Sequence, residues 1–586
     1  MSKLNVDQKT IKNLLSDNRA VFLIPDYQRP YAWDAEKECQ VLWDDIFTFA
    51  IPDNDYSKFQ SQIDEYYLGP IVTFKNTDNQ FEVIDGQQRL TTLLLLLRAF
   101  YSFFDNMKDS NAIATRDAIA KCIWTTDEFG HPDYSSLKIN SEVATDKDKE
   151  EFLQILRTGI DKPEMKSKYA QNFRFFKRQI EEFLKSFPSY FAYLPTRILN
   201  NCIILPIEAE SQDTALRIFS TLNNRGKALS DADIFKAEFY KYYSQKGEKE
   251  CFISRWKELE ELCEKNFHPI SGTPMDELFT RYMYYERAKM GKKNSTTEAL
   301  RTFYSYDHYA IFKNDETLTN LELVAAFWND ILAQDNSRFT EKVLHQLYIL
   351  NYAPNGMWTY LVTVYFMCNR DANTNLLDNE KFYIFLCKIT AFIWGYAITN
   401  PGVNALRTPI YAEMVNLVKG IEVEFKEFMF PKTRTRSVFE NYNFYNGKPI
   451  TRSMLVWWAM YQEGQSTPSI DTIFEIEHIY ARNRALHIHK LNNPDNIESI
   501  GNKSLLEKRI NIRASDYLFK DKINYYKGFT TQKGEEKKAT TIKELIEIAN
   551  TFVDFKEEDI IQRKKKILDS FCNYLQQNGL LSEDTI

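Results

Sequence analysis

The stretch Phe81–Phe100 reads FEVIDGQQRLTTLLLLLRAF, and this pattern predicts a strand, a sharp turn and a buried helix. Three of its first four residues are apolar, which is typical of a buried strand. Asp85 and Gly86 form a turn pair that ends the strand. The leucine-rich run Leu90–Leu97 has good helix propensity and favours a helix in the protein core.

Three polar residues, Gln87, Gln88 and Arg89, stand between this strand and the leucine run. A helix N-terminus binds anions readily, because its first backbone N–H groups are unpaired and carry a partial positive charge. The planar fork of Arg89 suits phosphate, and the two glutamine amides can read the edge of a base or ribose. The same pattern also fits a polar turn that caps a core helix and leaves an arginine on the surface. Residue types alone leave both interpretations open.

An upstream stretch, IPDYQRPYAWD at Ile24–Asp34, combines basic and aromatic residues. Pro30 excludes the helical region for the residue before it, so the stretch is predicted to be extended and to turn a corner. Arg29 could then reach a phosphate, and Tyr31 and Trp33 could form the wall of a pocket. The alternative is that both aromatic side chains belong to the core beneath a loop.

Further strands and helices are expected on either side of the opening stretch. Tyr67–Phe74 should form a hairpin with the strand that begins at Phe81, and Cys202–Ile207 should form another buried strand. The chain between this hairpin and residue 200 is expected to be mostly helical. The segment Ala215–Phe239 should end in a helix that is capped near Ser230 or Asp231.

Three of these stretches together resemble a known domain. Asp-Gly-Gln-Gln-Arg after a strand, Gln-Arg-Pro-Tyr-x-Trp upstream and Phe-x-x-Leu-Asn-x-Arg-Gly-x-x-Leu downstream are similar to elements of the ParB/sulfiredoxin-like domain of GmrSD-type enzymes. These enzymes form a type IV restriction family with phosphorothioate-sensing relatives. The resemblance implies binding of GTP or another NTP by Gln28, Arg29, Asp85, Gly86, Gln87, Gln88 and Arg89. It also implies a sensor pocket that is lined by Tyr31, Trp33, Asn223 and Arg225.

Near the C-terminus, FEIEHIYARN at Phe474–Asn483 and ESIGNKSLLEKRINIRASDYLFKDK at Glu498–Lys522 form a second informative pair. The first reads as a strand that ends at Glu477-His478. The second reads as a strand through Leu506 and then a helix that carries Asn511. This order of strand, loop, strand and helix resembles the ββα-metal, or HNH, nuclease domain, including that of CRISPR effector nucleases.

The resemblance implies a role for each polar residue in this order. Hydrolysis of a phosphodiester needs a base for water and a cation at the phosphate. His478 would be the general base, and Glu477 and Asn511 would supply oxygens to Mg²⁺ or Mn²⁺. Asn502 would orient the loop that aims His478. The chain has Glu477 where many HNH sites have Asp, and Ala481 where a proline is common, so the ligand set and an inactive domain both stay open.

Charge is distributed unevenly along the chain. The net charge is −7, yet the segment between residues 481 and 527 holds ten Lys and Arg against five Asp and Glu. Further basic runs lie at Pro431–Arg436 and Arg563–Lys566. Because these runs flank the nuclease pattern, we expect them to contact the DNA backbone. The expected contact residues are Arg482, Arg484, Lys503, Lys508, Arg509 and Arg513.

Length and composition predict a multidomain α+β chain that is predominantly helical. The 586 residues exceed a single core, which predicts two to four domains. Together with the two resemblances, this implies an N-terminal α/β domain at 1–240, a helical middle at 241–435 and a nuclease domain at 436–586. Eight cysteines occur without a C-x-x-C pair, and no signal peptide is visible, which favours a reducing cytoplasm. The most apolar segment, Phe382–Ile398, contains Lys388 and is expected to be a buried helix rather than a membrane span.

The sequence therefore predicts a cytoplasmic endonuclease of antiviral defence that cuts or nicks modified phage DNA and couples this to an NTP. Its expected partners are double-stranded DNA and a nucleoside triphosphate, without a membrane. A homo-oligomer or partner proteins of the same defence system are compatible with this prediction. Two alternatives remain open: a nucleotide-gated DNA-binding or regulatory protein with an inactive nuclease domain, and a nuclease that needs no nucleotide.

Overall fold

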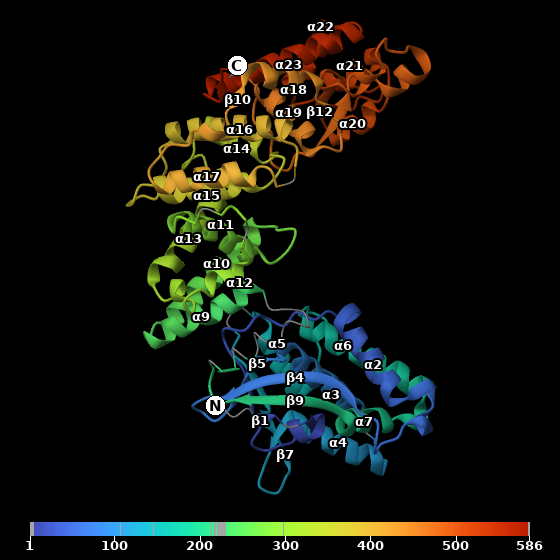
Figure 1. The fold of residues 1–586 in the computed structure, drawn as a ribbon. Helices are drawn as coiled ribbons and strands as arrows, with labels where there is room; N and C mark the ends of the chain where they lie inside the picture. Colours follow the sequence, from blue (N-terminus) through green and yellow to red (C-terminus); the bar gives the residue numbers. More distant parts are fainter. Residues whose placement is uncertain are drawn as a thin grey trace. The chain divides into compact units, whose positions relative to one another are not determined.

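The structure is a computed structural model, and it describes residues 5–6, 8–105, 107–143, 146–212, 214, 215, 218, 230–292, 294–296, 298–402 and 404–583. The chain divides into two compact units, Met1–Glu258 and Leu259–Ile586. Helices account for 58% of the residues, which confirms a predominantly helical α+β chain. Figure 1 shows the elements of each unit.

The first unit is built on a seven-stranded mixed sheet with the order β1-β9-β4-β5-β3-β8, in which β2 also pairs with β9. The strands are β1 Asn5–Val6, β2 Lys9–Thr10, β3 Phe22–Ile24, β4 Tyr66–Lys75, β5 Phe81–Asp85, β8 Ile139–Ser141 and β9 Cys202–Ala209. β4 and β5 form the predicted antiparallel hairpin. β9, which contains the predicted strand at 202–207, lies parallel beside β4 (Figure 1).

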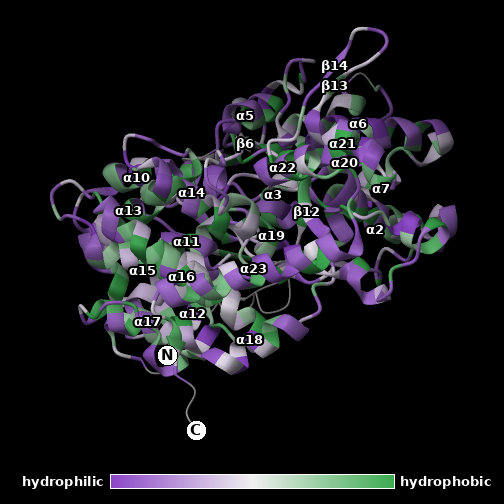
Figure 2. Cartoon of the chain, turned by 90° about the horizontal axis from the view of Figure 1, so that it is seen from above, coloured by the Kyte–Doolittle hydropathy of each residue, from purple (hydrophilic) through white to green (hydrophobic). Residues whose placement is uncertain are grey.

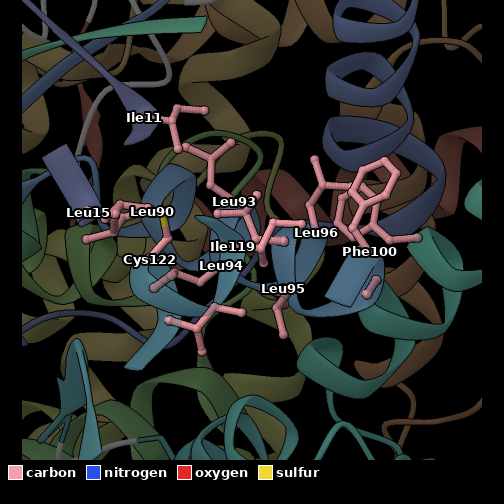
Figure 3. Packing of buried hydrophobic residues seen from close by; sticks show 14 of the residues in the cluster. Ile11, Leu15, Leu90, Leu93, Leu94, Leu95, Leu96, Phe100, Ile119 and Cys122 are labelled. Atoms are coloured by element: carbon pink, nitrogen blue, oxygen red, sulfur yellow. The ribbon is translucent and has the colours of Figure 1, made fainter. Parts of the chain in front are cut away.

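Helix α3 (Gln87–Phe104) follows β5 directly and forms the centre of this unit. Gly86 precedes the helix with φ 92°, a left-handed conformation that suits glycine. A Cβ atom at this position would lie 2.7 Å from the side chain of Ile71. The leucines of Leu90–Leu97 are fully buried and pack against Ile11 and Ile119 of neighbouring helices (Figure 3). Each buried leucine contributes about 1.5–3 kcal/mol, so this helix is a major part of the core.

Other helices of the first unit surround this sheet and α3. They are α1 Ile11–Leu15, α2 Gln40–Ala50, α4 Ser110–Ile123, α5 Lys149–Thr158, α6 Lys168–Ser186, α7 Tyr193–Asn201 and α9 Asp231–Gln245, and α10 Lys249–Asn266 follows at the boundary of the units. α9 begins where the sequence predicts, because Ser230 and Asp233 form a capping box. The expectation of a mostly helical chain up to residue 200 is confirmed by α4, α5, α6 and α7, and the same stretch also contains β6 (Trp124–Thr126) and β7 (Pro132–Leu137), which form a hairpin before β8.

The second unit opens with a layered helical part, as predicted. Its helices are α11 Pro274–Lys289, α12 Leu300–Tyr304, α13 Asp315–Leu332, α14 Glu341–Leu350, α15 Met357–Asn369, α16 Asn379–Thr399 and α17 Arg407–Val418. Figure 2 shows polar and apolar residues alternating along many helices, as expected for amphipathic helices in packed layers. α16 is long and apolar enough to cross a membrane, but 61% of its apolar window is buried, which confirms the predicted buried helix.

The C-terminal part of the second unit combines helices with short strand pairs. Its helices are α18 Lys432–Asn441, α19 Pro449–Met460, α20 Lys508–Ala514, α21 Phe519–Lys527, α22 Lys543–Thr551 and α23 Glu557–Gln577. Its strands are β10 Phe430–Pro431, β11 Phe474–His478, β12 Lys503–Glu507, β13 Phe529–Thr530, β14 Glu536–Lys537 and β15 Leu581–Ser582. β10 pairs with β15, so the end of the chain closes back onto the start of this part.

Candidate active site

The C-terminal part contains the predicted order of strand, loop, strand and helix. β11 and β12 are antiparallel, with His478 opposite Lys503 and Glu477 opposite Ser504. β11 ends at His478, and α20 begins directly after β12 and carries Asn511. The connection of 24 residues between the strands includes Glu498. His478 and Asn502 thereby lie at one end of the two-stranded sheet, whereas α20 begins at the other end, beside Phe474.

His478 is buried at the end of β11, with 9% of the residue exposed. Among the residues that the structure describes, its Nε2 atom has no hydrogen-bond partner, and Oε1 of Glu498 lies 3.5 Å away. Burial lowers the pKa of His478 to about 4, assisted by the positive charge of Arg482 and opposed by Glu498. The imidazole is therefore neutral at physiological pH, which is the form that a general base requires.

Asn502 directly precedes β12 and lies beside the residues that follow His478 in the chain. Its Oδ1 accepts a hydrogen bond from the backbone N–H of Tyr480 at 2.7 Å, and its Nδ2 donates to the carbonyl of Tyr480 at 3.1 Å. The backbone carbonyl of Asn502 accepts from Ile479 N at 2.9 Å. Because Asn502 is fully buried, these bonds hold the two residues after His478 in one conformation. That Asn502 thereby aims His478 for catalysis stays a prediction.

Glu477 faces away from His478, since successive side chains on a strand point to opposite faces. Its Oε1 accepts hydrogen bonds from Lys522 Nζ at 2.7 Å and Tyr526 OH at 2.6 Å, both on α21. Lys522 also donates to the carbonyl of His478 at 2.7 Å. The contacts of Glu477 thus fit a buried ion pair better than the predicted metal ligand, because the ammonium already neutralises the carboxylate.

Asn511, predicted to supply a metal oxygen together with Glu477, contacts the carboxylate of Glu475. Its Nδ2 donates to Oε2 of Glu475 at 2.9 Å. Glu475 lies two residues before Glu477 and so on the same face of β11, a relation that strand periodicity could have revealed. Within the described residues, no group of three or more His, Cys, Asp or Glu side chains could hold a metal ion. Mg²⁺ needs only one or two carboxylates and keeps several waters, so the Glu475–Asn511 pair fits this ion in donor type.

The predicted DNA-contact residues divide into buried and exposed groups. Lys503 is fully buried, with Nζ 2.6 Å from Oε2 of Glu498 and from the carbonyl of Phe444, so its prediction as a surface contact is wrong. Arg484 forms a two-fold contact with Asp554 at 2.6 and 2.7 Å and is mostly covered. The expected residues that remain on or near the surface are Arg482, Lys508, Arg509 and Arg513.

In the first unit, the two elements around Asp85–Arg89 and Gln28–Trp33 lie in contact, as the resemblance implies. Gln87 Nε2 donates to the carbonyl of Arg29 at 3.0 Å, and Gln88 Oε1 accepts from the backbone N–H of Ala32 at 2.7 Å. Gln28 donates to the carbonyl of Ile84 at 3.0 Å. These glutamine amides hold backbone segments together. The amide groups of Gln87 and Gln88, which were expected to bind a base or ribose, therefore bind main-chain atoms instead.

The two arginines of this region have different environments. Arg89 is half-buried and donates to the carbonyl of Pro70 at 2.8 Å, and burial lowers the pKa of its guanidinium. Arg29 is half-buried too, but its guanidinium makes no hydrogen bond or ion pair within the described residues. Burial raises the pKa of Asp85, whose Oδ1 accepts from the backbone N–H of Gly86 at 2.7 Å. Of the two arginines, only Arg29 therefore has a guanidinium without a hydrogen-bond acceptor among the described residues.

The predicted sensor pocket is largely absent at its aromatic residues. The hydroxyl of Tyr31 is buried between Thr92 at 2.6 Å and Asn172 at 2.8 Å, and its ring stacks on Tyr169. Trp33 is half-buried and packs against the same core. Tyr31 is thus a core residue beneath a loop, and its prediction as a pocket residue is wrong. Asn223 and Arg225 lie outside the described residues.

Comparison with known families gives two matches. Residues 11–240 match the N-terminal domain of the GmrSD restriction endonuclease, and residues 431–570 match the C-terminal domain of GmrSD restriction endonucleases. The two matches together span more than half of the chain. No curated protein matches the chain. With both domains present in the expected order, the chain belongs to the GmrSD restriction endonuclease family, whose members are restriction-type nucleases with DNA as substrate.

Proposed function

We propose that this protein is a metal-dependent HNH endonuclease of cytoplasmic antiviral defence, which cuts or nicks modified DNA with His478 as general base. The observation that carries the proposal is a neutral, buried histidine at the end of β11, with Asn502 fixing the next two residues. The antiparallel strand pair and α20 supply the ββα order in which such a base is used.

The proton transfer follows from the groups around His478. Glu498 lies 3.5 Å from Nε2 and favours the tautomer with the proton on that nitrogen. The lone pair of Nδ1 is then available to take a proton from the attacking water. Asn502 keeps the ring aimed by holding the following backbone, which limits the reorganisation needed in the transition state.

A divalent cation completes this chemistry. Asn511 and Glu475 are the candidate donors for Mg²⁺ or Mn²⁺, but Glu475 lies three residues before His478 and, like Glu477, on the opposite face of β11, so action on one phosphate would require the ion and His478 to approach it around the strand. Glu477 would join these donors only if Lys522 released its carboxylate. The bound ion would neutralise charge on the scissile phosphate and on the departing oxygen. Oxygen donors without cysteine favour these hard ions over zinc.

We further propose that the first unit binds a nucleoside triphosphate, GTP or another NTP, and that binding or hydrolysis controls cleavage. Arg29 and the unpaired N–H groups at the start of α3 would hold the phosphates. Asp85 lies beside them and would either hold a magnesium ion or orient Arg29. Two observations support this proposal: Gln87 holds the backbone of Arg29 beside the start of α3, and the Arg29 guanidinium makes no hydrogen bond or ion pair within the described residues while its charge acts to lower the pKa of Asp85.

One alternative has support of its own. A nucleotide-gated DNA-binding or regulatory protein with an inactive nuclease domain is favoured by the Glu477–Lys522 ion pair, which occupies the carboxylate next to the base. Purified protein incubated with modified and unmodified plasmid, with Mg²⁺, Mn²⁺ or EDTA and with or without GTP or ATP, separates the two. Metal-dependent cleavage that is lost in His478→Ala supports the proposal. DNA binding without cleavage in every condition supports the alternative.

A further inference from the structure

Arg563 lies within a basic run that the sequence predicts to contact DNA, but its side chain is buried, with 7% of the residue exposed. It extends from α23 to the carboxylate of Glu544 on α22. Nε and one terminal nitrogen donate to the two oxygens of Glu544, each at 2.8 Å. Trp458 of α19 donates from Nε1 to the same carboxylate at 2.6 Å. Three helices thus meet at one ion pair.

The remaining nitrogen of Arg563 contacts the segment that leads into β12. It lies 3.2 Å from the carbonyl oxygen of Ile500, 3.0 Å from that of Gly501 and 2.7 Å from that of Lys503. The backbone of α23 touches this segment as well. A Cβ atom at Gly501 would lie 2.1 Å from the carbonyl oxygen of Ile560, so only glycine allows this approach.

These three carbonyl groups belong to residues on either side of Asn502. Asn502 in turn binds the residues that follow His478, the proposed base. Asn502 holds the backbone of Ile479 and Tyr480 through bonds of 2.7 to 3.1 Å. Both residues directly follow His478. The link from Glu544 to the residue next to the base therefore consists of the hydrogen bonds of Arg563, the peptide backbone of residues 500–503 and the hydrogen bonds of Asn502. Each side chain in this link is buried, so water does not compete for the bonds.

We propose that Arg563, held by Glu544, is a positioning residue for DNA cleavage: it fixes residues 500–503, and through Asn502 it fixes the direction of His478. This inference rests on the proposed function of His478. It also replaces the expectation that Arg563 binds DNA. A planar guanidinium is required because it donates to a carboxylate and to a cluster of carbonyls at the same time.

The test uses Arg563→Lys in the full-length protein. Lysine keeps the positive charge opposite Glu544, but a single ammonium cannot reach both the carboxylate and the three carbonyl groups. Hydrogen exchange at the backbone amides of Ile479 and Tyr480, followed by mass spectrometry, should become at least about tenfold faster. The kcat for plasmid cleavage should fall about tenfold or more, while KM for DNA stays unchanged because no exposed cation is removed.

Arg281→Lys is a matched control in the same compact unit. Arg281 is also buried, with 8% of the residue exposed, and its Nε donates to Glu277 at 2.9 Å. It packs between Phe267 and Trp328 in the helical part and makes no contact with residues 500–503. This variant should lower the melting temperature as Arg563→Lys does, but leave kcat and the exchange of Ile479 and Tyr480 at wild-type values.

Three outcomes would overturn the proposal. One is unchanged exchange at Ile479 and Tyr480 in Arg563→Lys, and another is faster exchange with an unchanged kcat. A fall in kcat of equal size in Arg281→Lys would show a general effect of lost stability. If the wild-type protein cleaves no DNA in any condition, the proposed function fails and takes this inference with it, which distinguishes that result from the other three.

Discussion

Replacing His478 by alanine should abolish DNA cleavage while the protein stays folded. Loss of a general base lowers a rate about a hundredfold to ten-thousandfold, which corresponds to about 2.7–5.5 kcal/mol in the activation barrier. The structural cost is smaller. The imidazole is neutral at physiological pH, and Glu498 beside Nε2 keeps its ion pairs with Arg482 and Lys503, so the substitution leaves no unpaired buried charge behind. A typical single substitution costs about 0.5–3 kcal/mol, below the usual stability of a folded protein.

The assay is single-turnover nicking of supercoiled plasmid with Mg²⁺ at equal protein concentrations. The melting temperature of each variant is measured alongside, so that loss of folding is distinguished from loss of the base. His268→Ala serves as the control, because His268 is an exposed histidine between α10 and α11 and away from the strand pair. We expect wild-type rates for the control and a loss of at least about a hundredfold for His478→Ala. Cleavage by His478→Ala at the wild-type rate would refute the assignment of the base.

Three further predictions concern metal, nucleotide and pH. EDTA should abolish cleavage, and added Mn²⁺ should restore it. The affinity for Mn²⁺, measured by calorimetry, should be lower in Glu475→Gln than in Glu477→Gln. Equal affinities in the two variants would contradict Glu475 and Asn511 as the donor pair. Arg29→Ala should weaken GTP or ATP binding about ten- to a hundredfold in titration calorimetry, as loss of one charge-assisted contact does. Arg89→Ala should mainly lower the melting temperature, because Arg89 binds the carbonyl of Pro70. The reverse pattern would restore Arg89 as the phosphate ligand. Asp85→Asn should raise the melting temperature at pH 7.5. Burial raises the folded pKa of Asp85 above its ordinary value of 3.8, so the ionised carboxylate destabilises the folded protein as the pH rises through the folded pKa. A thermal-shift series should therefore show that the gain in the variant vanishes near pH 3.5, where the wild-type carboxyl is protonated.

Ion pairs near β11 explain why the number of Lys and Arg residues in the sequence overstates the positive charge that is exposed to DNA. Lys503 and Arg563 belong to the predicted DNA-contact regions, yet both are buried, and each has a carboxylate partner, the half-buried Glu498 and the buried Glu544 respectively. A buried cation needs such a partner, because transfer of a charge out of water is costly. The exposed pair Lys508 and Arg509 is left as the clearest basic surface near the strand pair.

The sequence alone determined the elements whose signals are local. The strand, turn and helix around Asp85–Arg89 were predictable, because a glycine at a left-handed position and a leucine run are signals within a few residues. The order of β11, β12 and α20 was predictable for the same reason. The family followed from short motifs in a fixed order. The hairpin β6–β7 was missed, since its polar residues carry little period-two signal.

Only the tertiary structure decided how the polar side chains are used. Gln87 and Gln88 bind backbone atoms about 58 residues away, and Arg563 binds carbonyl groups about 60 residues away. Sequence shows residue types but not such distant partners, and burial depends on packing of the whole unit. A glutamine amide or an arginine fork fits a ligand and a backbone carbonyl equally well. Which of the two it binds is set by the fold, because an unpaired polar group in the core costs more than any local propensity can supply.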